Sequence, residues 1–262
     1  MSDGDPGYDA LVRDGVLRIA RPGTEWLSTG ANGGRVRADC AYNLSVPEGW
    51  NRTDLAAYVT ERLERAGFLA DSRRTDAARG PALLTGVDVA HARGARCGPV
   101  TAYATVGLSN PAALPMDPPG GSLPDETDTA DGDPDAADGD SSPVGTVNVL
   151  VGTTRSLPDG ALANLVAVAA EAKAATLLAR TGFPGTTTDA VVAGHDPDGT
   201  PAAFSGSATP VGAAARACVR EAVTASLEAR YDDTSIPDSV EEATYGVSTD
   251  ARARVFRPDR SE

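Results

Sequence analysis

The sequence has almost no lysine, few aromatic residues and no long apolar run. Lys173 is the only lysine among 23 basic residues, aromatic residues make up 5% of the 262 residues, and the net charge is −14 at pH 7. A nucleic-acid partner or an anionic membrane surface is not expected, because phosphate groups attract clustered basic side chains. No segment reaches the roughly 20 apolar residues that a membrane-spanning helix needs. The N-terminus MSDGDPGYDA lacks the basic and apolar regions of a secretory signal, so a soluble, cytoplasmic protein is predicted.

The sequence is rich in acidic residues, which outnumber the basic residues 37 to 23, and nearly all of the basic residues are arginine. Hydrophobic residues make up 41% of the chain, which is enough for a sizeable core, and Ala and Val often stand where bulkier residues are usual. Such acidity is typical of a protein that stays soluble in concentrated salt, where screening weakens the repulsion between its own charges. We therefore predict a halophilic protein.

Cysteine and histidine are too sparse for the common metal and redox motifs. The cysteines Cys40, Cys97 and Cys218 form no CxxC pair, and small buried apolar residues in a reducing compartment are expected. His91 and His195 lie far apart, and no HExxH, GxSxG or P-loop motif is present. The segment GHDPDGT predicts a turn with His195 at the surface. No metal site is predicted.

The chain divides into one candidate domain with polar ends. The segment 116–143 contains many Asp, Gly and Pro residues and no basic residue, so it cannot bury enough apolar surface to offset the entropy of ordering. We predict a disordered acidic insertion within a single domain over 15–230. Polar tails are expected at 1–14 and 231–262, the second of them peripheral.

The apolar periodicity predicts strands in the first half and two long helices in the second. This order favours the α+β class, with a mixed or antiparallel sheet covered by two or three long helices, and leaves the topology open. Asp54 or its neighbour Thr53 is suited to cap the first helix. Strands are expected over 15–20, 35–46, 82–90, 101–109, 144–153 and 188–194, and helices over 54–66, 159–181 and 211–230.

Lys173 is placed unusually for a lysine. On the helix 159–181 it falls on the stripe formed by Leu165, Ala169 and Leu177, where a charged group is costly unless it is paired or reaches a cavity. Two interpretations remain open: a buried ion pair with a distant residue such as Asp189, or extension of the side chain to solvent near the helix end. Glu171 projects from nearly the opposite side, where a solvated face is expected.

Three segments stand out: TEWLSTGANGGRVRADCAYNLSVPEG (24–49), ATVGLSNP (104–111) and GTVNVLVGTTRSLPDGALANLVAVAAEAKAATLLARTGFPGTTTDAVVAG (145–194). In this order they resemble the adenosylcobinamide amidohydrolase family. The resemblance covers most of residues 15–230, and the third block is specific by its length and order. One departure is GTTTD, where family members often have GTGTD, and it is tolerable if Thr187 has a negative φ.

The resemblance implies hydrolysis of the amide that joins aminopropanol to the corrin ring of adenosylcobinamide. The products are adenosylcobyric acid and aminopropanol, in salvage of cobalamin precursors. Cobalt arrives within the corrinoid substrate, so no further cofactor is expected. The alternative is a corrinoid-binding carrier or sensor without catalysis, and the oligomeric state stays open.

The matched positions imply the site residues, with two mechanisms left open. In the first, Glu171 or Asp189 is the general base and Lys173 tunes it or donates the proton. In the second, Thr146 or Thr188 is a nucleophile that Lys173 activates. The substrate carbonyl or the corrin amides would be bound by Asn43, Asn110 and Asn148, with Thr146 beside them.

Overall fold

Two β-sheets form the centre of the molecule. The computed structural model describes residues 7–31, 33–47, 50, 52–69, 80–124, 145–243 and 245–258. A six-stranded sheet has the order β4-β3-β11-β10-β8-β7, and a four-stranded sheet has the order β1-β2-β5-β6. β10 pairs parallel with β11 and antiparallel with β8, so the larger sheet is mixed. The strands are β1 (Asp9–Arg13), β2 (Val16–Ala20), β3 (Glu25–Ser28), β4 (Gly34–Arg37), β5 (Cys40–Ser45), β6 (Ala82–Thr85), β7 (Arg93–Cys97), β8 (Val100–Val106), β10 (Val147–Ser156) and β11 (Ala190–Pro201).

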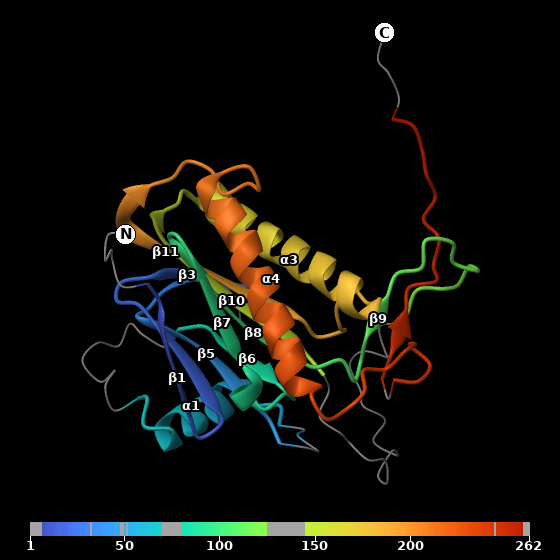
Figure 1. The fold of residues 1–262 in the computed structure, drawn as a ribbon, viewed down its shortest axis with the longest axis horizontal. Coiled ribbons are helices and arrows are strands. Elements are labelled where there is room, and N and C mark those ends of the chain that lie inside the picture. Colours follow the sequence, from blue (N-terminus) through green and yellow to red (C-terminus); the bar gives the residue numbers. More distant parts are fainter. Residues whose placement is uncertain are drawn as a thin grey trace.

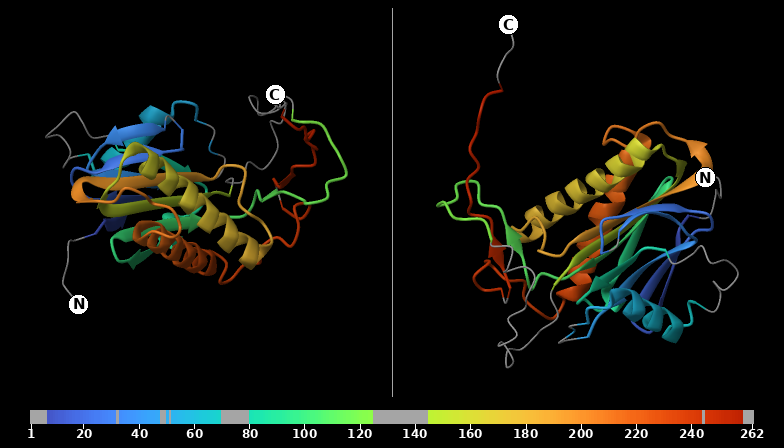
Figure 2. Two further views of the ribbon diagram at one scale, coloured as in Figure 1. Left: turned by 90° about the horizontal axis from the view of Figure 1, so that it is seen from above. Right: turned by 180° about the vertical axis from the view of Figure 1, so that it is seen from behind.

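Helices cover the outer faces of these sheets. The long helices α3 (Asp159–Thr181) and α4 (Pro210–Arg230) pack side by side on one face of the six-stranded sheet (Figures 1 and 2). The other face packs on the four-stranded sheet, and α1 (Leu55–Arg65) packs against that sheet. The α+β class with a mixed sheet under long helices is therefore confirmed.

The central strand β10 is buried on both faces. Val149 and Val151 contact the core beneath α3 and α4, while Leu150 belongs to the core between the two sheets. Asn148 points to the same side as Leu150, because side chains alternate along a strand. One polar side chain is thereby placed between the sheets, which is where the site described below is found.

Helix α3 has the predicted bounds and is a core helix. It begins after Pro158, and Gly182 ends it with a left-handed φ of 81°, which a glycine adopts at no steric cost. By length and composition this helix is apolar enough to cross a membrane, but half of its most apolar window is buried inside the domain. Its buried side chains pack against β10 and α4.

Two predicted strands differ in the structure. Residues 35–46 form β4 and β5, which belong to different sheets, because the chain bends at Asp39, whose carboxylate accepts a hydrogen bond from the Gly23 amide (2.8 Å). The strand expected over 82–90 ends at Thr85. A 3-10 helix, Val89–His91, follows it, and the Asp88 side chain caps that helix by accepting from the Ala90 amide.

The two ends are more ordered than the predicted tails. Residues 9–13 form β1, which pairs with β2, so the domain begins before residue 15. In the C-terminal segment, β12 (Val247–Ser248) pairs in parallel with β9 (Ala112–Ala113), and both residues of β12 are exposed. The peripheral position of the tail from 231 stays a prediction. Most of the predicted acidic insertion, from 125 to 143, lies outside the described residues.

Candidate active site

A cavity of about 540 Å³ opens at one end of the six-stranded sheet. Both sheets contribute to it. Its walls are the loop after β3, the first turns of α1, the strand β6, and the starts of β10 and β11. Three of the predicted site residues line it: Asn148, Thr188 and Asp189. These residues come from segments 40 positions apart, which the parallel pairing of β10 with β11 brings together.

Lys173 and Asp189 form a buried ion pair at this end of the sheet. Lys173 comes from the second half of α3 and Asp189 directly precedes β11. The two side chains are 10% and 12% exposed, so neither charge is surrounded by water. Of the two interpretations of Lys173, the pairing with Asp189 is confirmed and the extension to solvent is wrong. A lysine on a packed stripe needs a counter-charge, and Asp189, the partner named from the sequence, supplies it.

The Asp189 carboxylate is held by four donors. Its Oδ1 accepts from the Val147 amide (2.9 Å) and the Thr186 hydroxyl (2.5 Å), and its Oδ2 accepts from the Thr186 amide (3.1 Å) and from Lys173. A Cβ on Gly185 would lie 2.3 Å from Asp189 Oδ2 and 3.0 Å from Lys173 Nζ. Glycine is therefore required there, because a side chain would push the ion pair apart.

Threonine hydroxyls lie beside the ion pair. Thr146 Oγ1 and Thr188 Oγ1 are 3.0 Å apart, and the Thr188 hydroxyl lies 3.1 Å from the Gly145 carbonyl, to which it donates. The Asn110 amide donates to Thr187 Oγ1 (2.6 Å), which fixes the loop before β11. Thr187 has a negative φ, since Asp14 is the one described non-glycine residue with a positive φ. The departure from GTGTD is thus accommodated without strain.

A buried amide ladder runs behind the cavity wall. Asn43 donates to Thr105 Oγ1 (2.9 Å), and Asn148 donates to Asn43 Oδ1 and to the Leu84 carbonyl, both at 2.9 Å. Both hydrogens of the Asn148 amide are therefore used within the protein. Asn148 cannot donate to a substrate carbonyl in this arrangement, and its Oδ1 has no partner among the described residues. Asn43 and Asn110 are fully buried and are absent from the cavity lining, so they support the wall from behind.

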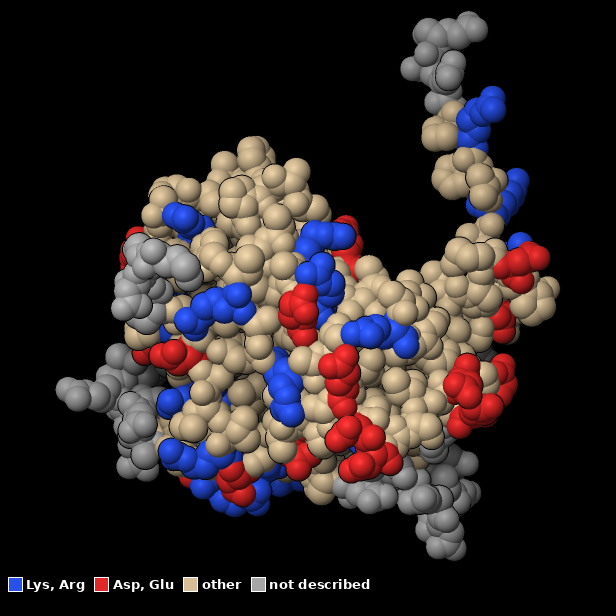
Figure 3. All heavy atoms as spheres, in the orientation of Figure 1, with Lys and Arg blue, Asp and Glu red and all other residues tan. Residues whose placement is uncertain are grey.

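Glu171 lies away from this cluster. Its side chain is 63% exposed and pairs with Arg216 of α4 at 3.3 Å. Figure 3 shows basic and acidic side chains interspersed on the face that α4 presents. The spacing of two residues on a helix turns Glu171 away from Lys173, so the structure does not bring it to Asp189. A solvated face, the simpler expectation for Glu171, is what the structure shows, and we do not retain it as a candidate general base.

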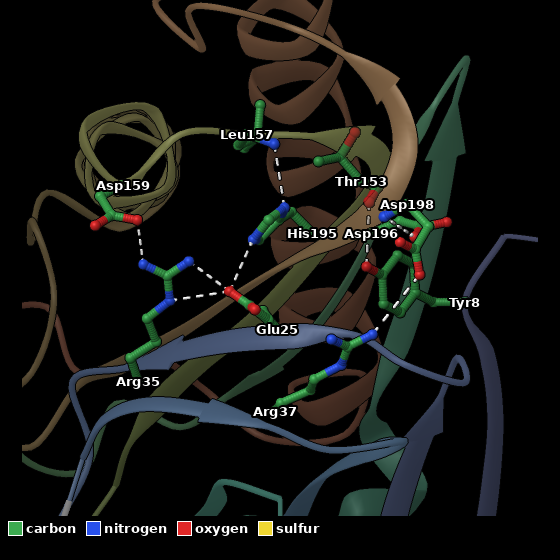
Figure 4. A network of polar contacts seen from close by, with 10 residues as sticks. All are labelled: Tyr8, Glu25, Arg35, Arg37, Thr153, Leu157, Asp159, His195, Asp196 and Asp198. Carbon is green, nitrogen blue, oxygen red and sulfur yellow. Dashed lines mark hydrogen bonds and ion pairs between the residues drawn. The ribbon is translucent and has the colours of Figure 1, made fainter.

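His195 is buried, contrary to the predicted surface turn. Figure 4 shows its ring between Leu157 and Glu25: Nδ1 accepts from the Leu157 amide (3.1 Å) and Nε2 lies 3.4 Å from Glu25 Oε2. Burial lowers the pKa of His195, which favours the neutral ring. Glu25 also pairs with Arg35, and Arg35 pairs with Asp159 at the start of α3. The alternation along β11 puts residue 195 on the helix-facing side, and this pattern in the sequence indicates a buried His195.

The glycine-rich loop after β3 is part of the site, although the sequence alone assigns it no role. Ser28, Gly30 and Gly33 line the cavity. A Cβ on Gly33 would lie 2.3 Å from the Ser28 carbonyl oxygen, and a Cβ on Gly30 would lie 2.5 Å from Leu83. The backbone therefore approaches Gly33 too closely for a side chain there, whereas a side chain at Gly30 would have to displace the end of Leu83. The glycine-rich run GANGG is the sequence pattern that indicates such a tight loop.

Two of the cysteines differ in exposure. Cys97 is exposed, so the prediction that it is buried is wrong, whereas Cys218 is buried as expected.

The fold and the cavity define a two-sheet α+β domain with a buried lysine–aspartate pair at its site. Comparison with known proteins identifies it further. The sequence profile of the adenosylcobinamide amidohydrolase family matches residues 4–235, and the chain belongs to this family. An adenosylcobinamide amidohydrolase of Halobacterium salinarum is 59% identical over 96% of this chain and 100% of that protein. One of Methanosarcina mazei is 26% identical over 84% and 97%. The crystal structure of the PH0078 protein from Pyrococcus horikoshii aligns with a TM-score of 0.41 and 13% identity, covering 84% of this chain and 83% of that one.

Proposed function

We propose that this protein hydrolyses the aminopropanol amide of adenosylcobinamide in the cavity beside the Lys173–Asp189 pair. The family and its 59% identical relative support the reaction. The observation that supports the location is the convergence of the family segments. The loop after β3, the start of β10 and the residues before β11 come from distant parts of the chain and line one cavity. The relative from Halobacterium salinarum also fits the acidic, halophilic composition.

The roles follow from which atoms are already engaged. The Asp189 carboxylate already accepts four hydrogen bonds within the protein, so we assign it to holding Lys173 and the loop 185–188. The Lys173 ammonium has three N–H bonds, and Asp189 is its one hydrogen-bond partner among the described residues. We assign Lys173 to supplying positive charge to the reacting amide and the proton that the leaving amine needs. A water molecule attacks the carbonyl carbon, the C–N bond breaks, and the proton that the water gives up restores the Lys173 ammonium.

Thr188 is the hydroxyl that we place against the substrate. It is exposed and lines the cavity, whereas its neighbour Thr146 is buried. We expect Thr188 to orient the amide, with Thr146 holding the hydroxyl of Thr188 at 3.0 Å. Cobalt belongs to the corrinoid, and we propose that the reaction needs no metal bound by the protein. We also propose that the enzyme is cytoplasmic.

Substrate turnover in high salt tests this function. The purified protein is incubated with adenosylcobinamide, and free aminopropanol and adenosylcobyric acid are followed by mass spectrometry. Equal release of both products is expected, with a chelator present or absent. Binding of the corrinoid without cleavage would contradict the proposal and favour a carrier or sensor.

Two substitutions on one helix test the assigned roles. Lys173→Met retains bulk and removes the charge, and we expect turnover to fall by about 10²–10⁴, the range for loss of a positioned proton donor. Glu171→Gln is the matched control two residues away, where the side chain is exposed, and we expect activity within twofold of the original. Full turnover by folded Lys173→Met protein would overturn the assignment of Lys173.

A further inference from the structure

The C-terminal segment forms a strand beside the loop that follows β8. The amides of Tyr245, Val247 and Thr249 donate to the carbonyls of Ser109, Pro111 and Ala113, at 3.1, 3.0 and 3.0 Å. Figures 1 and 2 show the C-terminal segment lying alongside residues 111–124, beside the end of α3. Arg252 extends the contact, because it bonds to the Pro118 carbonyl (2.9 Å) and to Asp117 (2.6 Å).

The opposite edge of the same loop contacts the residues that hold the ion pair. The Ala112 amide donates to the Gly185 carbonyl (3.0 Å), and the Thr187 amide donates to the Asn110 carbonyl (3.3 Å). Pro111 and Thr186 form an antiparallel bridge. The segment 109–113 is therefore a middle strand, with 245–249 on one side and 185–187 on the other.

The residues 185–187 on this edge hold the Lys173–Asp189 pair in position. Thr186 donates two hydrogen bonds to Asp189, and Gly185 lies directly against the ion pair. A displacement of 185–187 would move the donors of the Asp189 carboxylate and hence the position of Lys173. Catalytic groups lose efficiency when they are displaced by even about 1 Å.

We propose that residues 245–249 are a positioning strand for the Lys173–Asp189 pair, acting through the segment 109–113. The family profile ends at residue 235, so this strand lies beyond the part of the chain that the profile matches. Its contacts to 109–113 are main-chain hydrogen bonds, which require an extended backbone with free N–H groups rather than particular side chains. Because the proposal concerns catalysis at this pair, it rests on the proposed function.

A proline scan along the strand tests it. Val247→Pro removes the amide hydrogen that bonds to Pro111. Ser248→Pro is the matched control, because the amides of Val247 and Thr249 face 109–113 and the alternation along the strand turns the Ser248 amide the other way. We expect kcat to fall about tenfold in Val247→Pro with KM within twofold, and both constants to stay within twofold in Ser248→Pro. Thr249→Pro removes only the last bond and should give a smaller loss of kcat.

Hydrogen exchange separates positioning from general destabilisation. In Val247→Pro we expect faster exchange at the amides of Thr186 and Thr187, while the amides of β10 and the urea midpoint of the whole protein stay unchanged. Equal kcat in Val247→Pro and the original protein would overturn the proposal. So would equal losses in Val247→Pro and Ser248→Pro. If Val247→Pro does not fold, Thr249→Pro decides by the same comparison. An inactive original protein would instead refute the proposed function.

Discussion

Replacing Lys173 by methionine should destabilise the fold as well as reduce activity. The change leaves the Asp189 carboxylate charged and only 12% exposed, without its counter-charge. Removing one partner of a buried ion pair costs about 3–5 kcal/mol. Three protein donors, from Val147 and Thr186, remain on the carboxylate. Methionine also retains much of the apolar stem, so we expect about 3 kcal/mol, the lower end of that range.

Urea unfolding at constant high salt measures this loss, since the free energy of unfolding falls linearly with urea concentration. Salt screens the buried pair weakly, so the loss should persist in concentrated KCl. Combining Lys173→Met with Asp189→Asn removes both charges. We expect the double variant to lose less free energy of unfolding than the two single variants together, by at least about 1.5 kcal/mol.

Glu171→Gln provides the comparison for an ion pair at the surface. Glu171 and Arg216 are 63% and 41% exposed, so their separation should cost less than about 1 kcal/mol. If Lys173→Met also lowers the free energy of unfolding by less than about 1 kcal/mol, the reasoning is refuted. So small a loss is expected of an exposed ion pair and not of a buried one.

Three further measurements test other parts of the structure. A thiol reagent should modify Cys97 in the folded protein and Cys218 only after unfolding, because Cys218 is buried and burial raises its pKa to about 11; equal rates would contradict this. The native pKa of His195 is lowered, so the unfolded chain binds more protons, and the stability that its neutral ring contributes should be lost as the pH falls below about 6.5. His195→Gln should flatten the dependence of the urea midpoint between pH 7.5 and 5, and an unchanged slope would contradict it. Asn43→Ala leaves its partners on Thr105 and Asn148 unsatisfied and should lower the free energy of unfolding by about 2 kcal/mol; a change within about 0.5 kcal/mol would show that the ladder is not needed for stability.

Local periodicity was enough to predict the elements that bear the site. The bounds of α3 follow from Pro158 at its start and Gly182 just past its end, and the side-chain alternation along β10 puts Asn148 on the face opposite to Val149. Lys173 could be singled out because a lysine on an apolar stripe breaks the helix pattern. These signals depend on residues within a few positions of one another, which is the range over which a sequence pattern is informative.

Contacts between distant segments could not be predicted in this way. The run 35–46 reads as one strand, but the bend at Asp39 assigns its halves to different sheets. His195 follows the strand pattern into the core although its neighbours Asp196, Asp198 and Gly199 are typical of a turn. The C-terminal segment is polar, and its strand pattern is no longer than two residues. The sequence therefore does not predict that this segment pairs with residues 109–113.

The sequence by itself determined the family, the α+β class and the principal helices, and it singled out Lys173 and Asp189 as candidate site residues. Only the tertiary structure decided that these two residues meet, that Glu171 stays outside, and that Asn148 has no hydrogen left to donate. The physical reason is that a helix or strand forms from neighbours in the chain. A site of this kind forms where β5, β10, β11, α3 and the loop after β8 pack together, and the Asn148–Asn43 hydrogen bond joins residues 105 positions apart in the sequence.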